Sequence, residues 1–195
     1  MNDTLMKRLN EIVPKLLSSE LLQGSGPGNE IGFYIFDYPP EFELEIREHI
    51  EFVKKELVKK MPDLKVEHVD LFRFILEYFK DLFEDDNVLD LAIEIQRNKG
   101  NTEVLEYLKG ALEESKVAKA FAHKVLASPP NLVIVSGVGA AYPLIRSHSL
   151  LNNLHHLLEH IPLVLFYPGV YDGQGLKLLD SLPVQNYYRA FRLVP

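Results

Sequence analysis

The sequence contains no cysteine among its 195 residues. Disulfide bonds, a thiol nucleophile and zinc or iron–sulfur sites held by cysteine are therefore excluded. The chain also lacks any apolar run close to the roughly 20 residues needed to span a bilayer. Its first residues, MNDTLMKRLNEIV, include an aspartate and no long apolar core, unlike a signal peptide. We therefore expect a cytoplasmic protein that does not bind a membrane.

The chain also has no excess of positive charge. The chain has 21 lysine and arginine residues against 28 aspartate and glutamate residues, a formal net charge of -7. Proteins dedicated to the nucleic acid backbone are normally basic, so we expect no direct contact with nucleic acid. A local basic surface at Lys54–Lys60 leaves DNA or RNA binding open as a weaker alternative. The sequence also lacks internal repeats and low-complexity segments.

The apolar content is large enough for a real core. Hydrophobic residues make up 47% of the chain, which suits one domain covering residues 1–195. Short runs of apolar, β-branched and aromatic residues predict strands. These predicted strands cover residues 32–37, 65–70, 132–135, 163–167 and 187–194. Helical patterns separate them, so we predict an α/β fold of three layers, a mostly parallel five-stranded sheet with helices on both faces.

Helices are predicted in most of the remaining chain. An amphipathic helix covers residues 4–18, and a second opens at Pro39 and Pro40 with acidic residues first and lysines last, as the helix dipole favours. Residues 71–127 are helical throughout and form an insertion or a layer of three or four helices. Their predicted ranges are 71–83, 87–98, 102–112 and 115–127. The further predicted elements are a flexible connector at 24–28 and a short helix at 176–182.

A glycine turn stands in the most informative stretch, residues 131–158. A buried strand leads into Gly137 and Gly139, and we predict one long helix after them, with Pro143 in its first turn. A turn of this kind presents backbone N–H groups to an anion at the carboxyl edge of a parallel sheet. The third glycine of a dinucleotide fingerprint is absent, however. A tight strand-to-helix turn accounts for the glycines equally well.

Two carboxylates are expected near this edge of the sheet. Asp37 ends the first predicted strand, and Asp172 follows the fourth within the turn signal Tyr171-Asp172-Gly173. Two such groups could hold a metal or act as acid and base. Asp37 could equally fix the turn that follows it or cap the next helix.

Polar side chains also gather on the helix after the glycine turn. They are Arg146, Ser147, His148, Asn152 and Asn153. Ser147 and His148 form no recognisable nucleophile and base, because adjacent helical side chains diverge and no acid lies at a suitable spacing. His156 and His160 are four apart, but the metalloprotease order His-Glu-x-x-His is absent. We therefore expect caps, loop contacts or an interface here, and neither a catalytic nor a metal site.

Several short blocks together resemble a known family. They are Asn29-Glu30-Ile31, Phe36–Pro40, Arg47-Glu48-His49, Ser136–Gly139, Arg146-Ser147-His148, Leu150–Leu154, Phe166–Gln174 and Asn186–Phe191. In their order and spacing, which extend over nearly the whole chain, they resemble the BrxB family. This family is the B component of the BREX (bacteriophage exclusion) systems of phage defence.

The resemblance implies an adaptor without catalytic residues or cofactor. It would join other BREX proteins: an AAA+ ATPase, an alkaline-phosphatase-domain protein and an adenine-specific DNA methyltransferase. A homo-oligomer is also possible. The candidate interaction or ligand-binding residues are Asp37, Tyr38, Arg47, Gly137, Gly139, Arg146, His148, Asn152, Asn153, Tyr171, Asp172 and Arg189.

The expected sheet also resembles a degenerate P-loop NTPase core that lacks the Walker motifs. Residues 32–40 take the place of the phosphate loop but contain no lysine followed by serine or threonine. The strand 132–135 takes the place of the strand that ends in a magnesium-binding acid, yet Ser136 and Gly137 follow it. The alternative to an adaptor is an enzyme acting on nucleotides or phosphate esters. It would use the turn Gly137–Gly139 with Asp37, His148 and Asp172.

Overall fold

The structure is a computed structural model. It describes residues 3–23, 32–83, 87–158, 160–179, 185–186 and 190–195. The predicted connector at 24–28 and the candidate residue Arg189 lie outside these ranges.

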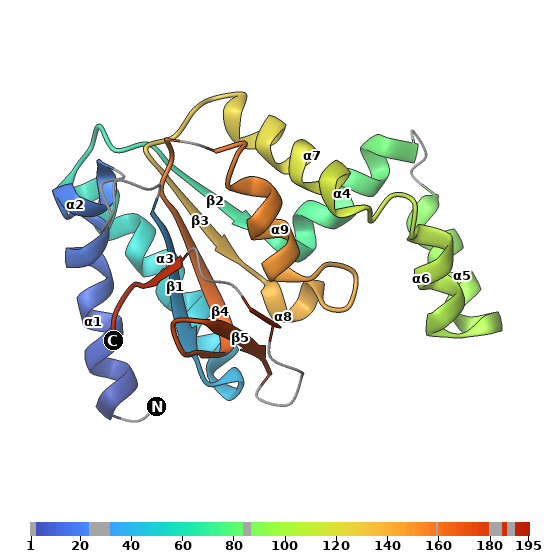
Figure 1. The fold of residues 1–195 in the computed structure, drawn as a ribbon, viewed down its shortest axis with the longest axis horizontal. Coiled ribbons are helices and arrows are strands. Elements are labelled where there is room, and N and C mark those ends of the chain that lie inside the picture. Colours follow the sequence, from blue (N-terminus) through green and yellow to red (C-terminus); the bar gives the residue numbers. More distant parts are fainter. Residues whose placement is uncertain (1–2, 24–31, 84–86, 159, 180–184, 187–189) are drawn as a thin grey trace.

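A parallel sheet forms the centre of the molecule (Figure 1). Its strands follow the order β2-β3-β4-β1-β7, and every neighbouring pair in this order is parallel. The strands are β1 (Phe33–Tyr38), β2 (Val66–Asp70), β3 (Leu132–Ser136), β4 (Leu163–Tyr171) and β7 (Ala190–Arg192). Strands β1 and β3 are buried along their whole length, as their unbroken apolar sequences require. The prediction of a mostly parallel sheet with five main strands is confirmed.

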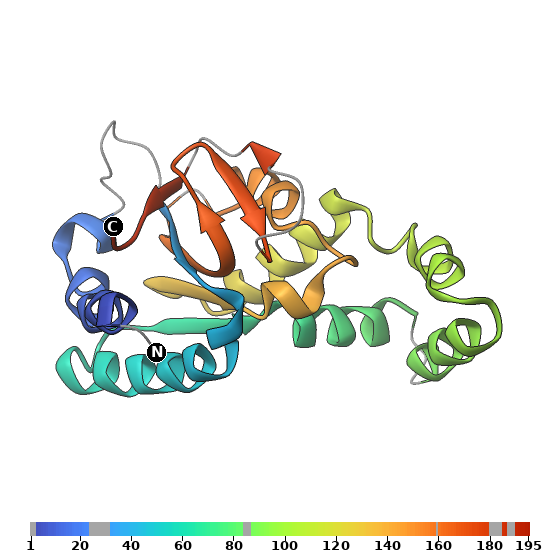
Figure 2. The same ribbon diagram turned by 90° about the horizontal axis from the view of Figure 1, so that it is seen from below.

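Helices cover both faces of this sheet and create two apolar cores (Figure 2). Alternate residues of β1 divide between them: Phe33 and Ile35 face one core, and Tyr34 and Phe36 face the other. On the Tyr34 side lie α1 (Asp3–Leu16), α2 (Ser19–Leu22) and α3 (Glu43–Lys60), the last preceded by the short 3-10 helix η1 (Pro40–Phe42). On the Phe33 side lie α4 (Leu71–Phe83), α7 (Glu114–Leu126), α8 (Val138–Ala141) and α9 (Ser147–Leu154). The three-layer α/β architecture is thus confirmed.

In its described residues, the helical stretch between β2 and β3 divides into four helices, in agreement with the predicted three or four. Besides α4 and α7, these are α5 (Val88–Lys99) and α6 (Asn101–Leu108). Helix α4 buries a stripe of five residues at helical spacing, Leu71, Phe74, Ile75, Tyr78 and Phe79. In contrast, α5 and α6 pack on each other and project away from the sheet (Figure 1). We call α5 and α6 the helical arm.

The prediction of one long helix after Gly139 is wrong. The chain instead forms two short helices, α8 and α9, separated by residues 142–146, which include a cis peptide bond between Tyr142 and Pro143. Tyr142 adopts an extended conformation with ψ of 137°, because a following proline disfavours the helical conformation. Pro143 therefore lies between two helices rather than in the first turn of one.

The short helix predicted at 176–182 is also wrong where the structure describes it. Strand β4 turns back into the antiparallel strand β5 (Gly175–Leu178), which pairs with β6 (Gln185–Asn186). Leu176 and Leu178 are buried and Lys177 is half-buried, the two-residue period of a half-covered strand. Gly169 permits this close pairing, since a Cβ there would clash with the backbone of Lys177. The predicted turn at residues 171–173 connects the two strands.

Candidate functional site

Asp37 lies buried at the carboxyl end of β1, with an exposed fraction of 6%. Its Oδ1 accepts a hydrogen bond of 2.6 Å from Arg8 Nη2 on α1. Its Oδ2 accepts bonds of 3.0 Å from Arg192 Nη2 on β7 and 3.1 Å from the backbone N–H of Tyr171 on β4. The carboxylate therefore joins four elements and is engaged in holding them together.

Arg8 extends this cluster to the last residues of the chain. Its guanidinium also donates to the carbonyl oxygens of Asp37, at 2.8 Å, and Val194, at 3.0 Å from Nη2. The same group lies 4.8 Å from the centre of the Phe36 ring, a cation–π contact. Tyr171, one of the candidate residues, is buried and donates its hydroxyl to the carbonyl oxygen of Ala190 at 2.6 Å. The sequence analysis missed Arg8, although it lies beside the buried Leu9 in the amphipathic stripe of α1.

Asp172 follows Tyr171 but has a different environment. It is exposed, and its Oδ1 accepts the backbone N–H groups of Gln174 at 2.9 Å and Gly175 at 2.7 Å. These two hydrogen bonds lower the pKa of the Asp172 carboxyl. The side chain thus fixes the turn between β4 and β5. Across the described ranges, no three histidine, aspartate or glutamate side chains are grouped so that they could hold a metal.

Tyr38 and Arg47 meet at a shared carboxylate. The Tyr38 hydroxyl donates to Glu43 Oε2 at 2.5 Å, and Arg47 Nε donates to Glu43 Oε1 at 2.8 Å. Burial, followed by the charge of Glu43, raises the pKa of the Tyr38 hydroxyl far above its ordinary value. The hydrogen bond between Tyr38 and Glu43 connects the end of β1 to the first turn of α3.

The glycine turn has a structural explanation at both glycines. Gly137 has φ of 71°, and a Cβ there would lie 2.7 Å from Oδ1 of Asp70. Asp70 also accepts the backbone N–H of Arg73 at 3.0 Å, at the start of α4. A Cβ at Gly139 would lie 3.2 Å from the Pro168 ring, so this glycine lets α8 approach β4 closely. With the Asp70 carboxylate against it, the turn is electrostatically unfavourable for a phosphate.

The polar candidates after this turn lie on or beside α9. Arg146 and Asn152 are exposed, and Asn153 Nδ2 donates to the carbonyl oxygen of Ser149 at 2.9 Å. His148 Nε2 lies 3.0 Å from Ser149 Oγ, and its buried Nδ1 has no hydrogen-bond partner within the part of the chain that the structure describes. Burial lowers the pKa of His148. Between the described residues, no hydrogen bond or ion pair joins these side chains to Asp37 or Asp172.

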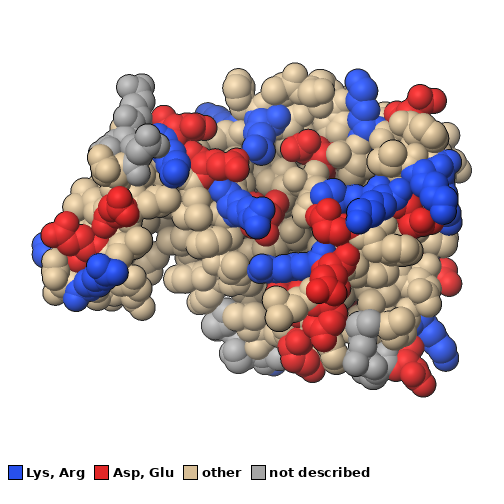
Figure 3. Space-filling model, turned by 180° about the vertical axis from the view of Figure 1, so that it is seen from behind, with Lys and Arg blue, Asp and Glu red and all other residues tan. Residues whose placement is uncertain are grey.

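A polar groove of about 380 Å³ lies along β2, and we call it the edge groove. Residues of β2, α3, α4 and α7 line it, Arg47 among them, together with Ser136 at the end of β3. His68 Nε2 lies 2.8 Å from Ser136 Oγ, and His68 Nδ1 lies 3.4 Å from Lys54 Nζ. Burial and then the charge of Lys54 lower the pKa of His68. Figure 3 shows basic and acidic side chains interspersed on this side of the molecule. The sequence analysis missed the groove, although charged residues within the strand 65–70 were a signal of an exposed edge.

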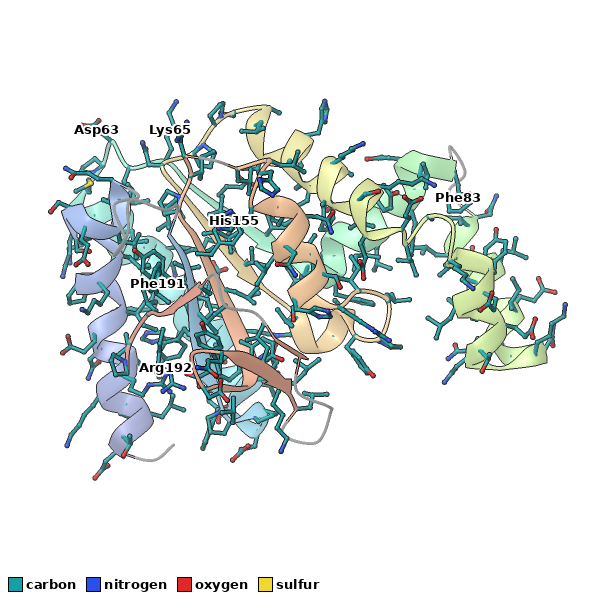
Figure 4. The ribbon with its side chains drawn as sticks, viewed as in Figure 1. Asp63, Lys65, Phe83, His155, Phe191 and Arg192 are labelled. Carbon is teal, nitrogen blue, oxygen red and sulfur yellow. The ribbon has the colours of Figure 1, made fainter. Side chains whose placement is uncertain are left out.

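A second groove, of about 520 Å³, lies between the helical arm and the body, and we call it the arm groove. Its lining is almost wholly apolar and includes Phe72, Leu76, Ile93, Val104, Leu105 and Leu144. The polar lining residues Gln96 and Asn101 bond to each other at 2.9 Å. Outside the groove, Leu91 is exposed on α5, and Phe83 is exposed at the end of α4, just before the arm (Figure 4). An apolar surface of this kind on a projecting element is typical of an interaction site.

The helices of the described residues include none that is both long and apolar enough to cross a membrane. No solved structure matches this fold.

The family model of the BREX protein BrxB matches residues 67–193. The BREX protein BrxB of Bacillus cereus (strain H3081.97) is 38% identical over 192 residues, which cover 96% of this chain and 96% of the relative. The BREX protein BrxB of Escherichia coli O9:H4 (strain HS) is 37% identical over 188 residues, which cover 96% of this chain and 90% of the relative. The chain therefore belongs to the BrxB family, a component of the BREX phage-defence systems.

Proposed function

We propose that this protein is a non-catalytic adaptor that binds other proteins of the BREX system. The observation that carries the proposal is the arm groove, an apolar groove of about 520 Å³ between the projecting pair of helices and the body. Its lining contains no charged side chain among the described residues. The fitting occupant is therefore an amphipathic helix that presents an uncharged face, with apolar residues three and four apart. The AAA+ ATPase, the alkaline-phosphatase-domain protein and the DNA methyltransferase implied by the resemblance are the candidates to supply it.

The state of the candidate catalytic residues supports the same proposal. Asp37 is engaged by Arg8, Arg192 and the Tyr171 backbone, and Asp172 is engaged by its own turn. Carboxylates that hold the fold in this way are poorly placed to transfer protons to a substrate. We also propose that the fold is a degenerate P-loop core. The order of the parallel sheet, in which β1 lies between β4 and β7, supports this likeness.

Co-purification from cells that carry the neighbouring BREX genes tests the adaptor. Ile93 lines the arm groove and is 44% exposed, so I93E places a charge in the groove without disturbing the core. We expect tagged wild-type protein to recover BREX proteins and I93E to lose at least one of them. Leu44 on α3 is 71% exposed outside the groove, so L44E is the matched control and should recover the same set. Recovery of the wild-type protein alone, or equal recovery by I93E, would count against the proposal.

A further inference from the structure

Strand β2 is an open edge of the parallel sheet. Within the part of the chain that the structure describes, it pairs with β3 alone. The carbonyl oxygen of Lys65 accepts the N–H groups of Asn131, at 2.7 Å, and Leu132, at 3.3 Å, so the backbone of Lys65 points toward β3. Backbone groups of successive strand residues point to opposite sides. Val66 and His68 therefore direct their N–H and C=O groups away from the sheet, where a further strand would bond.

The edge groove lies along β2, and His68 is the outward-pointing residue that lines it. Four consecutive β2 residues, 67–70, contribute to its lining. So do α3, which covers one face of the sheet, and α4 and α7, which cover the other. A groove that touches helices on both faces and the strand between them lies beyond the edge, where the next strand would run.

Three charged side chains in the groove form no ion pair with a described residue, and one of them, Asp70, instead accepts the backbone N–H of Arg73 at 3.0 Å. Lys54 pairs with Glu51 at 2.9 Å, Arg47 with Glu43 at 2.8 Å and Lys124 with Glu77 at 3.1 Å. The side chains of Glu67 and Arg73 also line the groove, and neither forms an ion pair with any described residue. Edge strands commonly carry charges that keep them from pairing indiscriminately. A strand that brings the opposite charges to these two positions would satisfy both.

We propose that β2 accepts an extended segment of a partner protein as an added strand. Its backbone bonds to Val66 and His68, a basic side chain of the segment pairs with Glu67, and an acidic side chain pairs with Arg73. Strand addition of this kind takes its affinity from main-chain bonds and its specificity from alternate side chains. A second copy of this chain is a poorer occupant, since its own β2 edge is flanked by its own α3 and α4. This surface is separate from the arm groove and does not depend on it.

Two-dimensional NMR of the whole ¹⁵N-labelled protein tests the proposal. The probe is the synthetic peptide TTKTVTETT, which carries its lysine, valine and glutamate on one face when extended. We expect the amides of Val66 and His68 to shift and to gain protection from exchange. Those of Glu67 and Val69 should stay as they are, because they already bond to β3. The reversed sequence TTETVTKTT reads the direction of the added strand, and TTQTVTQTT, without charges, should bind roughly two- to fivefold more weakly.

Variants give a second, independent readout. V66P removes one outward donor without removing a bond to β3 and should weaken binding about fivefold. E67K should weaken binding of TTKTVTETT roughly two- to fivefold, and TTETVTETT should restore it. The proposal is overturned if neither charged peptide shifts the Val66 and His68 amides at concentrations up to about 1 mM, or if the shifts do not alternate along β2. I93E should bind these peptides as the wild type does, so failure of the adaptor proposal is distinguishable from failure here.

Discussion

The carboxylate of Asp37 and the guanidinium of Arg8 form a 2.6 Å ion pair between groups 29 residues apart in the chain. The second oxygen of the same carboxylate pairs at 3.0 Å with Arg192, 155 residues away. A single buried side chain thus connects the first helix, strand β1 and the last strand. The cluster lies where an α/β protein usually keeps a catalytic group, but here it joins the two ends of the chain.

This arrangement predicts a large stability loss when Asp37 is neutralised. D37N leaves the half-buried guanidinium of Arg8 without its charge partner on the buried Asp37, and breaking a buried pair costs about 3–5 kcal/mol. We expect urea denaturation to show this decrease in the free energy of unfolding. The exposed Asp63 provides the matched control, since D63N should change the free energy by no more than about 0.5 kcal/mol. A D37N protein as stable as the wild type would show that the cluster contributes little.

A substitution at Gly137 should also reduce stability, for a different reason. In G137A the new methyl group meets the Asp70 carboxylate at 2.7 Å, and a left-handed conformation at φ of 71° costs a further 1–2 kcal/mol or so. G173A separates the two causes, because Gly173 has φ of 94° and nothing within 4 Å of its Cβ position. G110A, with neither constraint, should be neutral or slightly stabilising. Thermal melts should give G137A the lowest melting temperature, G173A the next and G110A the highest. Equal melting temperatures for G137A and G173A would show that the clash with Asp70 does not contribute.

The main elements could be predicted because each has a clear apolar period. The run Leu132–Val135 specifies a buried strand, and α4 specifies its buried face through five residues at helical spacing. The wrong predictions fall where the signal is short. Leu176 and Leu178 fit a strand and a helix equally well until the hairpin with β4 decides. At Pro143, the restriction on Tyr142 outweighed the helical pattern on either side.

The Asp37 cluster and the two grooves were harder to predict, because they depend on how distant parts of the chain come together. The position of Asp37 at the end of a strand was foreseeable, but its partners come from opposite ends of the chain, and no sequence spacing connects them. The edge groove depends on β2 being the outermost strand, which the order of strands along the chain does not determine. The arm groove likewise forms only because α5 and α6 pack on each other and away from the sheet.

Half-buried histidines predict that stability decreases in mild acid. Burial lowers the pKa of His49, His68 and His148 in the folded protein. The unfolded chain then binds protons more readily. The stability gained by keeping these rings neutral is therefore complete above about pH 6.5 and is lost as the pH falls, by at most about 1.4 kcal/mol per pH unit and histidine. Unfolding experiments at pH 7.5, 6.5 and 5.5 should show this loss. H68Q should reduce the slope and H156Q, at an exposed position, should not; an unchanged slope in H68Q would exclude His68 as a source.

The open edge of β2 predicts an alternating pattern of amide exchange in the protein alone. The N–H groups of Glu67 and Val69 point toward β3, whereas those of Val66 and His68 point away from it, at the open edge of the sheet. Hydrogen exchange followed by NMR should find the first pair at least about a hundredfold slower than the second. Strand β3 is the internal control, because β2 and β4 pair with it on either side. Its consecutive amides from Val133 to Val135 should all exchange slowly. Uniformly slow exchange along β2 would mean that another segment already covers this edge, and the groove would then be closed to a partner strand.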